Sequence, residues 1–494
     1  MDADLVAAAG AAALETAEGL GASHAEVRVE DVRSQVVALR DGRLETSADD
    51  TEIGVGVRVV HDGSMGFAAT VAVDPGDAAL LARRAVAAAR TTALAGGRRV
   101  ELVPEPSHGS VTWTAPHRID PVTVPMAEKV ALLEQWSNQL LASGPIDHVT
   151  ASVLAVSEEK HYADLQGTHA TQVRVRVHPQ LSALALSDSD GFEELRTVAP
   201  PAGRGWEYLQ GEGWDWDAEL ASMPELLAAK LAAPSVEPGH YDLVIDPTNL
   251  WLTIHESIGH ATELDRALGY EAAYAGTSFA TPDQLGSLRY GSPVMHVTGD
   301  RTVEHGLATV ALDDEGVPGQ SFDLVRDGVL VGYQLDRAIA GAIGADRSNG
   351  CAFADSPLHV PIQRMANVSL QPAPGVGPTV DELVSGVERG IYIVGDKSWS
   401  IDMQRYNFQF TGQRFFAICD GRLAGQLRDV AYQATTTDFW GSLEAVGGRS
   451  THLLGGAFNC GKGQPGQVAP VSHGCPAALF RGIRVLNARA ESGR

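Results

Sequence analysis

The sequence predicts an α+β protein with two domains. Residues 1–234 are expected to form an N-terminal α/β domain in which antiparallel strands are flanked by helices. Residues 235–494 are expected to form a C-terminal β-rich domain, barrel-like or sandwich-like, that carries a metal-binding helix. The first half alternates helical segments with runs of alternating polar and apolar residues, which are typical of half-buried strands. The second half has many short strand-like runs separated by glycines and Asp-Gly pairs, and one clear helix near its start.

The N-terminal domain begins with a helix that extends to about Leu20. Two Asp-Gly pairs follow, Asp41-Gly42 and Asp62-Gly63, and they predict tight hairpin turns in an antiparallel meander. Asp74-Pro75 then predicts the start of a second helix, with the aspartate as N-cap and the proline in the first turn. The strands of the meander are expected in five short runs, HAEVRVED, SQVVALR, GRLETSA, GVGVRVV and GFAAT.

The same order of elements recurs further along the chain. A stretch rich in glycine and proline, residues 96–125, reads as a long connection. Beyond it the pattern predicts a helix, a set of strands and a last helix that ends near Leu231. Residues 1–95 and 126–234 are therefore candidates for two similar subdomains, although their sequences do not match closely.

Composition and charge exclude several classes of function. The formal net charge is -25, which repels a phosphate backbone, so nucleic acid is not expected as a partner. No apolar run reaches the roughly 20 residues that a membrane span needs. Asp2 and Asp4 stand where a signal peptide would carry positive charge, and four cysteines are too few for a disulfide framework. We expect a cytoplasmic protein that binds neither membranes nor nucleic acid.

The helix near the start of the C-terminal domain carries a metal-binding pattern. Asp246-Pro247 predicts its first turn, and His255, Glu256 and His260 follow in the arrangement HExxxH. Histidines at i and i+5 of a regular helix are separated by roughly 140° and cannot share one metal ion. A π-bulge reduces the angle to about 50°, and Gly259 permits such a distortion. The sequence therefore predicts a bulged helix that holds a metal ion, with Glu256 as the general base.

Two imidazoles do not complete a catalytic zinc site, which takes three protein ligands and a water. Cys460, in the turn-like segment GGAFNCGKGQPGQ, is a candidate for the third ligand. Cys351 and Cys475 remain alternatives at this point. Cys419, in FFAICDG, is expected to be a buried strand thiol.

Other polar residues are candidates for supporting roles. Glu263 and Asp265, one turn beyond His260, can orient an imidazole or can be ordinary surface charges. His473 can donate a hydrogen bond to the tetrahedral oxyanion or can be a structural histidine. The acidic segment 313–315 is expected to form a turn rather than a second metal site.

Three segments together resemble the TldD/PmbA family of zinc metallopeptidases, and in particular its TldD-like, metal-carrying branch. They are the helix HESIGHATELD, the acidic segment DDEGVPGQ and the segment NCGKGQPGQ around Cys460. The similarity extends over about residues 20–475, and the three motifs stand in the family's order. The resemblance implies zinc as the cofactor, Cys460 as the third ligand, and a dimer with a TldE-like chain or a second copy. It also implies cleavage of unfolded peptides, in the maturation of modified peptides and the degradation of small labile proteins.

One segment departs from the family pattern. A Gly-Asn-Gly-Arg-Arg run is common in the family, whereas this chain has Asn349-Gly350-Cys351-Ala352. If the missing arginines contact peptide, the substrate preference of this protein differs from that of its relatives.

We therefore expect a zinc-dependent peptidase that hydrolyses unfolded or extended peptides. Zinc held by His255, His260 and Cys460 is expected to activate a water molecule, with Glu256 moving the proton. An extended substrate is expected to pair with an exposed strand edge near the metal. Two alternatives remain, a non-enzymatic chaperone-like partner and a zinc hydrolase of another amide or ester bond.

Overall fold

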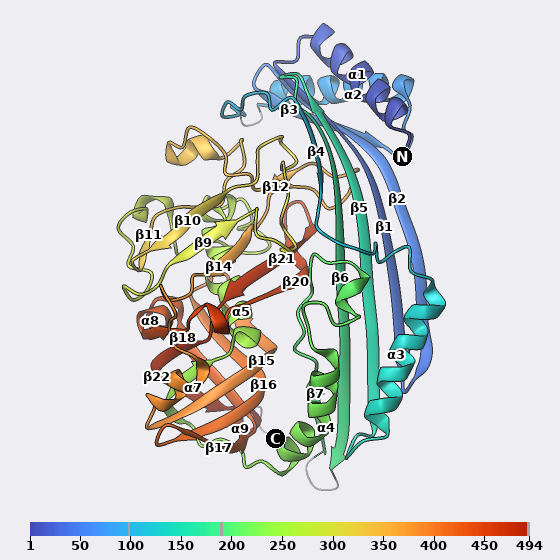
Figure 1. Ribbon diagram of the computed structural model, residues 1–494. Coiled ribbons are helices and arrows are strands. Elements are labelled where there is room, and N and C mark those ends of the chain that lie inside the picture. Colours follow the sequence, from blue (N-terminus) through green and yellow to red (C-terminus); the bar gives the residue numbers. More distant parts are fainter. Residues whose placement is uncertain (97–98, 188–190, 492–494) are drawn as a thin grey trace.

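The structure is a computed structural model that describes residues 1–96, 99–187 and 191–491. Its N-terminal half is built on one seven-stranded sheet in the order β3-β2-β1-β5-β6-β4, with β7 also paired to β6. The strands β1, β2, β5 and β6 are 17 or 19 residues long and run along most of the length of the molecule (Figure 1). The seven strands are β1 (His24–Arg40), β2 (Arg43–His61), β3 (Ser64–Thr70), β4 (Ser110–Thr114), β5 (His148–Asp164), β6 (His169–Ser187) and β7 (Gly191–Arg196).

The predicted hairpin turns of the meander are confirmed. Asp41 and Gly42 have φ angles of 50° and 70°, and Asp62 and Gly63 have φ angles of 49° and 71°, as a type I′ turn requires. The prediction of five short strands was wrong, because the five runs merge into three strands. No turn residue interrupts β1. Its polar middle lies between two apolar ends, Val27–Val29 and Val37–Leu39, which belong to different cores.

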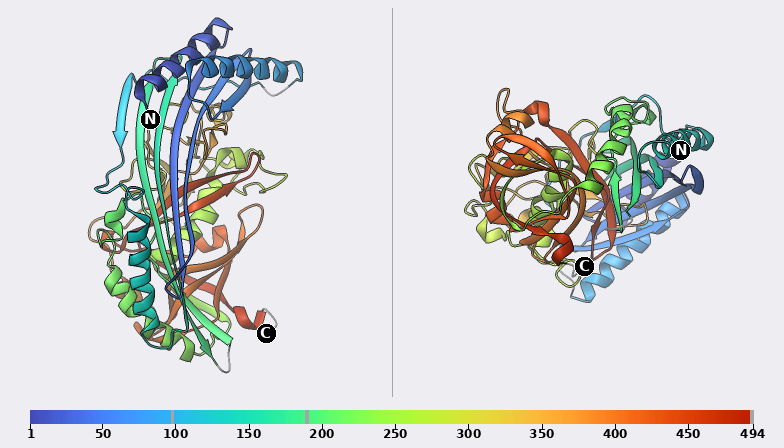
Figure 2. Two further views of the ribbon diagram at one scale, coloured as in Figure 1. Left: turned by 90° about the vertical axis from the view of Figure 1, so that its right-hand side faces the viewer. Right: turned by 90° about the horizontal axis from the view of Figure 1, so that it is seen from below.

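Two pairs of helices cover opposite ends of this sheet (Figure 2). At one end α1 (Ala3–Gly19) and α2 (Pro75–Leu94) share an apolar core with β1 and β2. At the other end α3 (Met126–Leu141) and α4 (Trp216–Ala232) share a second core with β5 and β6. The carboxylate of Asp74 accepts hydrogen bonds from the first turn of α2, as its position before a proline predicts. The hairpins β1–β2 and β5–β6 lie side by side in one sheet, because β1 pairs antiparallel with β5.

The C-terminal half contains a closed barrel of five strands, which decides between the barrel-like and sandwich-like alternatives. The ring β15-β8-β22-β18-β16 closes because β15 also pairs with β16, and Figure 2 shows the barrel nearly end-on. Only the β8–β15 pairing within this ring is parallel. The barrel strands are β8 (Gly239–Ile245), β15 (Arg389–Ile401), β16 (Asn407–Cys419), β18 (Val430–Thr435) and β22 (Ala478–Asn487).

Smaller elements surround the barrel. A four-stranded sheet in the order β11-β10-β9-β14 lies above the barrel in the view of Figure 1, and the hairpin β20–β21 lies between the barrel and the long sheet. A second hairpin, β12–β13, is separate from these sheets. Their bounds are β9 (Val297–Asp300), β10 (Ser321–Arg326), β11 (Val329–Leu330), β12 (Ala352–Phe353), β13 (Ile362–Gln363), β14 (Asn367–Leu370), β20 (Leu453–Lys462) and β21 (Gln467–Cys475). The remaining elements are α5 (Pro247–Ile254), α6 (Leu264–Ala267), α7 (Val380–Ser385), α8 (Thr436–Gly441), α9 (Ala488–Glu491), β17 (Arg422–Leu427) and β19 (Leu443–Val446).

Buried ion pairs join the long sheet to the C-terminal half. Arg58 on β2 bonds Glu26 on β1 and Glu315 of the acidic segment, both at 2.8 Å. Lys160 on β5 bonds Asp314 at 2.9 Å. Burial opposes the ionisation of Glu26, but Arg58 and His24 outweigh it and lower the pKa of its carboxyl to about 2. The acidic segment is a turn, as expected. Asp314 and Glu315 pair with cations of the long sheet and so join the two halves, whereas Asp313 accepts hydrogen bonds from backbone N–H groups.

Among the residues that the structure describes, no helix is both long and apolar enough to cross a membrane. The longest helix, α2, carries arginines and alanines along its length and packs on the long sheet.

We expect Gly66→Ala to lower the free energy of unfolding by about 1–3 kcal/mol. A Cβ at Gly66 would lie 2.0 Å from the carbonyl oxygen of Ala85, so α2 would have to move away from β3. Denaturant unfolding measures the change. Gly19→Ala is the matched control, because no atom lies within 4 Å of its added Cβ. Equal stability of Gly66→Ala and the wild type would contradict this packing.

Candidate metal centre

The helix that carries the HExxxH pattern changes its winding at the two histidines. α5 begins at Pro247, capped by the carboxylate of Asp246, which accepts from the N–H of Thr248. The chain then forms a π-helical turn at His255–Gly259 and a 3₁₀ turn at His260–Thr262. The predicted bulge between the histidines is therefore confirmed. It brings the two imidazoles together, with ring centroids 4.7 Å apart.

Gly259 is required at this turn by the packing around it. A Cβ at Gly259 would lie 2.6 Å from the sulfur of Met365, which is fully buried. The backbone carbonyl oxygen of Gly259 accepts a hydrogen bond from the side-chain amide of Gln334 at 2.7 Å. The carbonyl groups that a π-turn releases from the regular ladder thus find side-chain partners.

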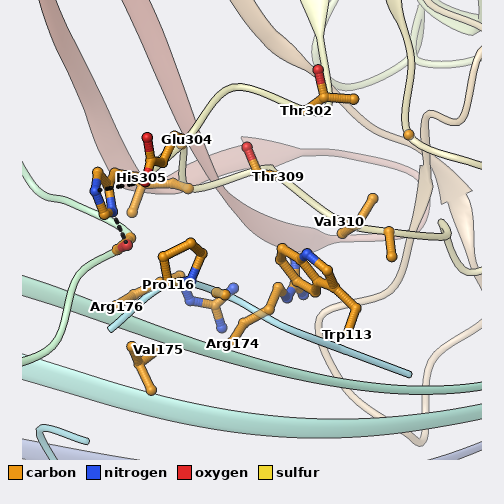
Figure 3. Close-up of a pocket in the computed structure, with 16 residues that line it drawn as sticks. Trp113, Pro116, Arg174, Val175, Arg176, Thr302, Glu304, His305, Thr309 and Val310 are labelled. Atoms are coloured by element: carbon orange, nitrogen blue, oxygen red, sulfur yellow. Dashed lines mark hydrogen bonds and ion pairs between the residues drawn. The ribbon is translucent and has the colours of Figure 1, made fainter. Parts of the chain in front are cut away.

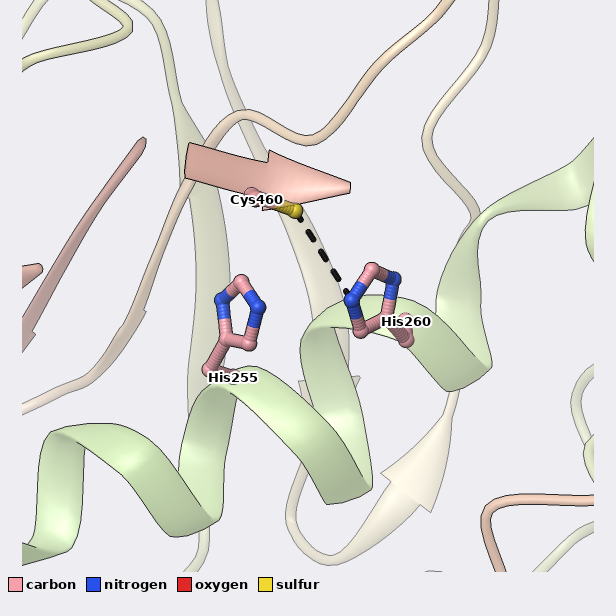
Figure 4. Close-up of side chains that lie close together, drawn as sticks. All are labelled: His255, His260 and Cys460. Carbon is pink, nitrogen blue, oxygen red and sulfur yellow. Dashed lines mark hydrogen bonds between the residues drawn. The ribbon is translucent and has the colours of Figure 1, made fainter. Parts of the chain in front are cut away.

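Cys460 on β20 lies next to these two imidazoles, although it is about 200 residues later in the sequence. Its sulfur lies 3.7 Å from Nε2 of His260, and the candidate ligand atoms of His255, His260 and Cys460 all lie within 4.8 Å of one another (Figure 4). All three side chains are buried. Within the described part of the chain, this is the one group of three such residues close enough to hold a metal ion.

The other cysteines stand apart from this group. Cys475 donates to the carbonyl of Pro247, and burial raises the pKa of the Cys351 thiol to about 12. The expectation of a buried Cys419 was wrong. This residue is the last of β16 and is exposed, because the Asp420-Gly421 turn follows directly.

Hydrogen bonds determine which ring nitrogen of His255 is free. Nδ1 of His473 lies 2.9 Å from the carbonyl oxygen of Val368, so it must carry the proton and donate. Its Nε2 is then an acceptor, and Nδ1 of His255, 2.7 Å away, donates to it. The lone pair of His255 is left on Nε2. Both nitrogens of His473 are engaged, so it orients His255 and has no donor for a substrate oxygen.

The carboxylate of Glu263 orients His260, as His473 orients His255. Nδ1 of His260 donates to Glu263 at 2.8 Å, which leaves Nε2 free beside Cys460. Burial opposes the ionisation of Glu263, but Lys462, His260 and Arg266 outweigh it and hold the pKa of its carboxyl well below its usual value. Of the two roles considered for Glu263, orientation of an imidazole is the one that this contact supports.

Lys462 is a residue that the sequence reasoning missed. Its ammonium group is buried and bonds Glu263 at 3.1 Å, Asp265 at 2.8 Å and Gln363 at 2.9 Å. The signal was available, because residues two apart on a strand share a face, and Lys462 follows Cys460 at that spacing. Cys460 and Lys462 therefore act on the same histidine from one strand, one directly and the other through Glu263.

The environment favours the protonation states that bind metal. Burial lowers the pKa of both His255 and His260 and so favours the neutral imidazoles that bind metal. Burial alone would raise the pKa of Cys460, but His260 and Arg364 outweigh it, and the net pKa of the thiol is lowered. Two imidazole nitrogens and a thiol that ionises readily form a donor set that fits a divalent metal of intermediate softness.

The three candidate ligands line a cavity of about 490 Å³ between the long sheet and the barrel. Glu256 also lines it and is bonded to Arg405, whose Nη1 lies 2.5 Å from Oε2 of Glu256. The wall opposite α5 is formed by β20 and by the segment 196–201 that follows β7. The arrangement places a metal site, a carboxylate and an arginine around a space large enough for a short length of peptide.

Comparison with known proteins agrees with this chemistry. Residues 238–487 match the family model described as the PmbA/TldA metallopeptidase C-terminal domain, and residues 25–89 match the model for metallopeptidase domain 1 of the same family. The chain belongs to the TldD/PmbA family of metallopeptidases. The predicted resemblance and the prediction of an enzyme are thereby confirmed.

Relatives and structures of this family cover nearly the whole chain. A protein of Methanothermobacter thermautotrophicus named metalloprotease is 28% identical over 94% of this chain and 95% of its own. A protein of Saccharolobus solfataricus named zinc metalloprotease TldD homolog is 22% identical over 96% of this chain and 98% of its own. TldE from Thermococcus kodakarensis has a TM-score of 0.71 at 15% identity, covering 97% of this chain and 99% of that one, and thus shares its fold.

The departure of this TldD/PmbA member at residues 349–352 lies outside the metal cavity. Cys351 and Ala352 are fully buried and do not line the cavity. Ala352 instead donates its N–H to Asp313. In this chain the segment has a structural role beside the acidic turn.

A second cavity, of about 350 Å³, shares no lining residue with the metal cavity. It is lined by Trp113, Arg174 and Arg176 on the long sheet, and by His305 and Glu304 opposite them (Figure 3). Arg174 and Arg176 both bond Glu158, and His305 lies against Gly203. Among the described residues that line it, no three metal-binding side chains form a group that could hold a metal ion.

We expect His473→Phe to weaken metal binding by roughly 10–100-fold, because it removes the acceptor that fixes the tautomer of His255. Competition with a chromophoric chelator measures the affinity, and circular dichroism checks the fold. His178→Phe is the control, since His178 lines the same cavity but stacks on Phe458 instead of bonding a candidate ligand. An unchanged affinity in folded His473→Phe would show that this histidine does not orient His255.

Proposed function

We propose that this metallopeptidase is a zinc enzyme in which His255, His260 and Cys460 bind the metal and Glu256 is the general base. The observation that carries the proposal is the convergence of these four side chains on one buried cavity. Nitrogen and thiolate donors in this number suit catalytic zinc, which keeps one position open for water or substrate. The name of the Saccharolobus relative, zinc metalloprotease TldD homolog, supports the same metal.

Zinc bound here would polarise the substrate carbonyl and lower the pKa of a water molecule toward neutrality. Glu256 takes one proton of the attacking water and passes it to the nitrogen of the leaving amine, so that the peptide C–N bond breaks. The second proton of the water also goes to the amine, and a carboxylate and an ammonium group result. His473 and Glu263 hold the two imidazoles in the tautomers described above. A thiolate ligand donates more charge to zinc than an imidazole does, and this increases the share of proton transfer that falls to Glu256.

We expect Glu256→Gln to retain one zinc per chain and to lose roughly 10²–10⁴-fold in kcat on an unfolded peptide. Zinc content by elemental analysis and peptide cleavage are measured on the same preparation. Glu134→Gln, on the exposed face of α3, is the control. Chelation should abolish cleavage by the wild type and added zinc should restore it. Cleavage by Glu256→Gln at the wild-type rate would exclude Glu256 as the base.

The substrate proposed is an unfolded or extended peptide that adds as a strand to β20. Among the described strands β20 pairs only with β21. The part of β20 from Gly455 to Gly461 lines the metal cavity. Gly461 is exposed, and no atom lies within 4 Å of a Cβ added there. Pairing through the main chain selects for an extended conformation and reads few side chains.

Strand addition predicts that main-chain N-methylation weakens cleavage at alternate positions. In an extended strand every second N–H points to the same neighbour, and loss of one hydrogen bond costs about 0.5–1.5 kcal/mol. We expect kcat/KM to fall by roughly 2–12-fold at those positions. A set of singly N-methylated copies of one well-cleaved peptide measures the pattern, with the intervening positions as internal controls. A loss without this alternation would contradict strand addition.

We also propose that the protein works in the cytoplasm as a dimer, with a TldE-like chain or a second copy as partner. Its four free cysteines suit a reducing compartment, and the likeness to TldE supports a partner of this fold. Hydrolysis of another amide or an ester remains the competing activity. A panel of ester and peptide substrates separates the two.

A further inference from the structure

Arg405 has a backbone conformation that its residue type rarely adopts. Its φ angle is +63°, in the left-handed region where a residue other than glycine carries a strain of about 1–3 kcal/mol. Of the eight non-glycine residues with positive φ in the described chain, five are aspartates, which tolerate this region. An arginine gains no such local compensation, so the surrounding structure must impose the conformation.

The turn that holds Arg405 is fixed from several sides. The carboxylate of Asp402 accepts hydrogen bonds from the N–H groups of Gln404, Tyr406 and Asn407, at 2.8–3.0 Å. Two further contacts come from other parts of the fold. Thr436 donates to the carbonyl oxygen of Arg405 at 2.7 Å, and the N–H of Phe279 donates to the carbonyl oxygen of Gln404 at 2.9 Å.

The result of this turn is that the Arg405 side chain lines the metal cavity. The side chain is 15% exposed and bonds Glu256 through Nη1 at 2.5 Å. Its Nε is buried and has no hydrogen-bond partner within the described residues. A guanidinium group has five N–H donors, so the bond to Glu256 leaves donors available for a second oxygen.

Two other side chains near the proposed metal site, His473 and Arg196, are engaged elsewhere. Both nitrogens of His473 are engaged, as shown above. Arg196 is paired with Asp396, which also accepts from the indole of Trp251. Arg405 is the cationic side chain in direct contact with the proposed base.

We propose that Arg405 is a catalytic residue that donates hydrogen bonds to the carbonyl oxygen of the scissile peptide bond as this oxygen becomes a tetrahedral oxyanion. This assignment rests on the proposed function, because the proposed metal site and base determine where the substrate carbonyl would bind. The guanidinium stays protonated throughout and can bond Glu256 and the oxyanion together. A cation held in place before the reaction stabilises developing charge without reorganising, and this accounts for the strained turn that holds it.

The test compares Arg405→Gly and Arg405→Lys in the zinc-loaded enzyme. Glycine adopts the local φ without strain, so Arg405→Gly should fold and bind zinc as the wild type does. Loss of one such donor should lower kcat by roughly 10²–10³-fold with a smaller change in KM. Arg405→Lys, which keeps the charge, should recover part of the rate. Arg326→Gln, on an exposed arginine of β10, is the control.

The deciding measurement is the binding of a phosphinic peptide built on the sequence that the wild type cleaves best. Its tetrahedral group carries the negative oxygen that the reaction develops. We expect calorimetry to show that Arg405→Gly weakens this binding by about the same factor as kcat falls. If kcat falls while the phosphinic affinity stays within twofold, Arg405 only positions Glu256 and the proposal is overturned. Unchanged kcat overturns it as well. Failure of the wild type to cleave peptides or bind the phosphinate would instead overturn the proposed function.

Discussion

The π-helical turn at His255–Gly259 is the constraint on which the metal centre depends. In a regular helix the two histidines would diverge by roughly 140°, and β20 could approach only one of them. One extra residue in the turn brings both rings to the same side and opens the helix toward Cys460. Such a turn costs regular hydrogen bonds. The packing of Met365 on Gly259 and the bond from Gln334 offset that cost.

Buried charged residues next to the candidate ligands connect the site to the rest of the C-terminal half. Lys462 neutralises Glu263, which in turn fixes the tautomer of His260. Since Cys460 and Lys462 lie on one strand, a shift of β20 would disturb the metal ligand and its support together. Breaking one member of such a buried set leaves an uncompensated charge, which is far more costly than a lost surface pair. The site is therefore coupled to the register of β20 against β21.

Local signals in the sequence predicted much of the fold and the centre of the site. The Asp-Gly turns and the Asp-Pro helix starts depend on adjacent residues only, and they are found where expected. The bulge followed from the spacing of His255 and His260. By contrast, the merging of short runs into β1 and β2 depends on the pairing of the polar parts of these strands with each other. The exposure of Cys419 likewise depends on where β16 ends. These are properties of the tertiary structure.

The roles of Arg405 and His473 likewise depend on tertiary contacts that the local sequence does not predict. Arg405 is brought to Glu256 by a turn that two distant residues hold in place. Thr436 lies 31 residues after Arg405, and Phe279 precedes it by more than 100 residues. His473 was a candidate from its sequence, but the choice between donor and orienting residue depended on Val368, which bonds one nitrogen and thereby settles the role of the other. No spacing rule contains that information.

The imidazoles of His255 and His260 have different hydrogen-bond partners at Nδ1, and this difference affects their reactivity. His260 bonds the Glu263 carboxylate, and His255 bonds a second imidazole. In the proposed zinc site His260 would therefore be the more strongly donating ligand. With a thiolate beside it, the electron-rich side of the site is that of His260 and Cys460. Glu256 and Arg405 lie in the same cavity with opposite charges. If zinc binds as proposed, its Lewis acidity would be reduced by these ligands, and Glu256 and Arg405 would supply part of the charge stabilisation that the metal gives up.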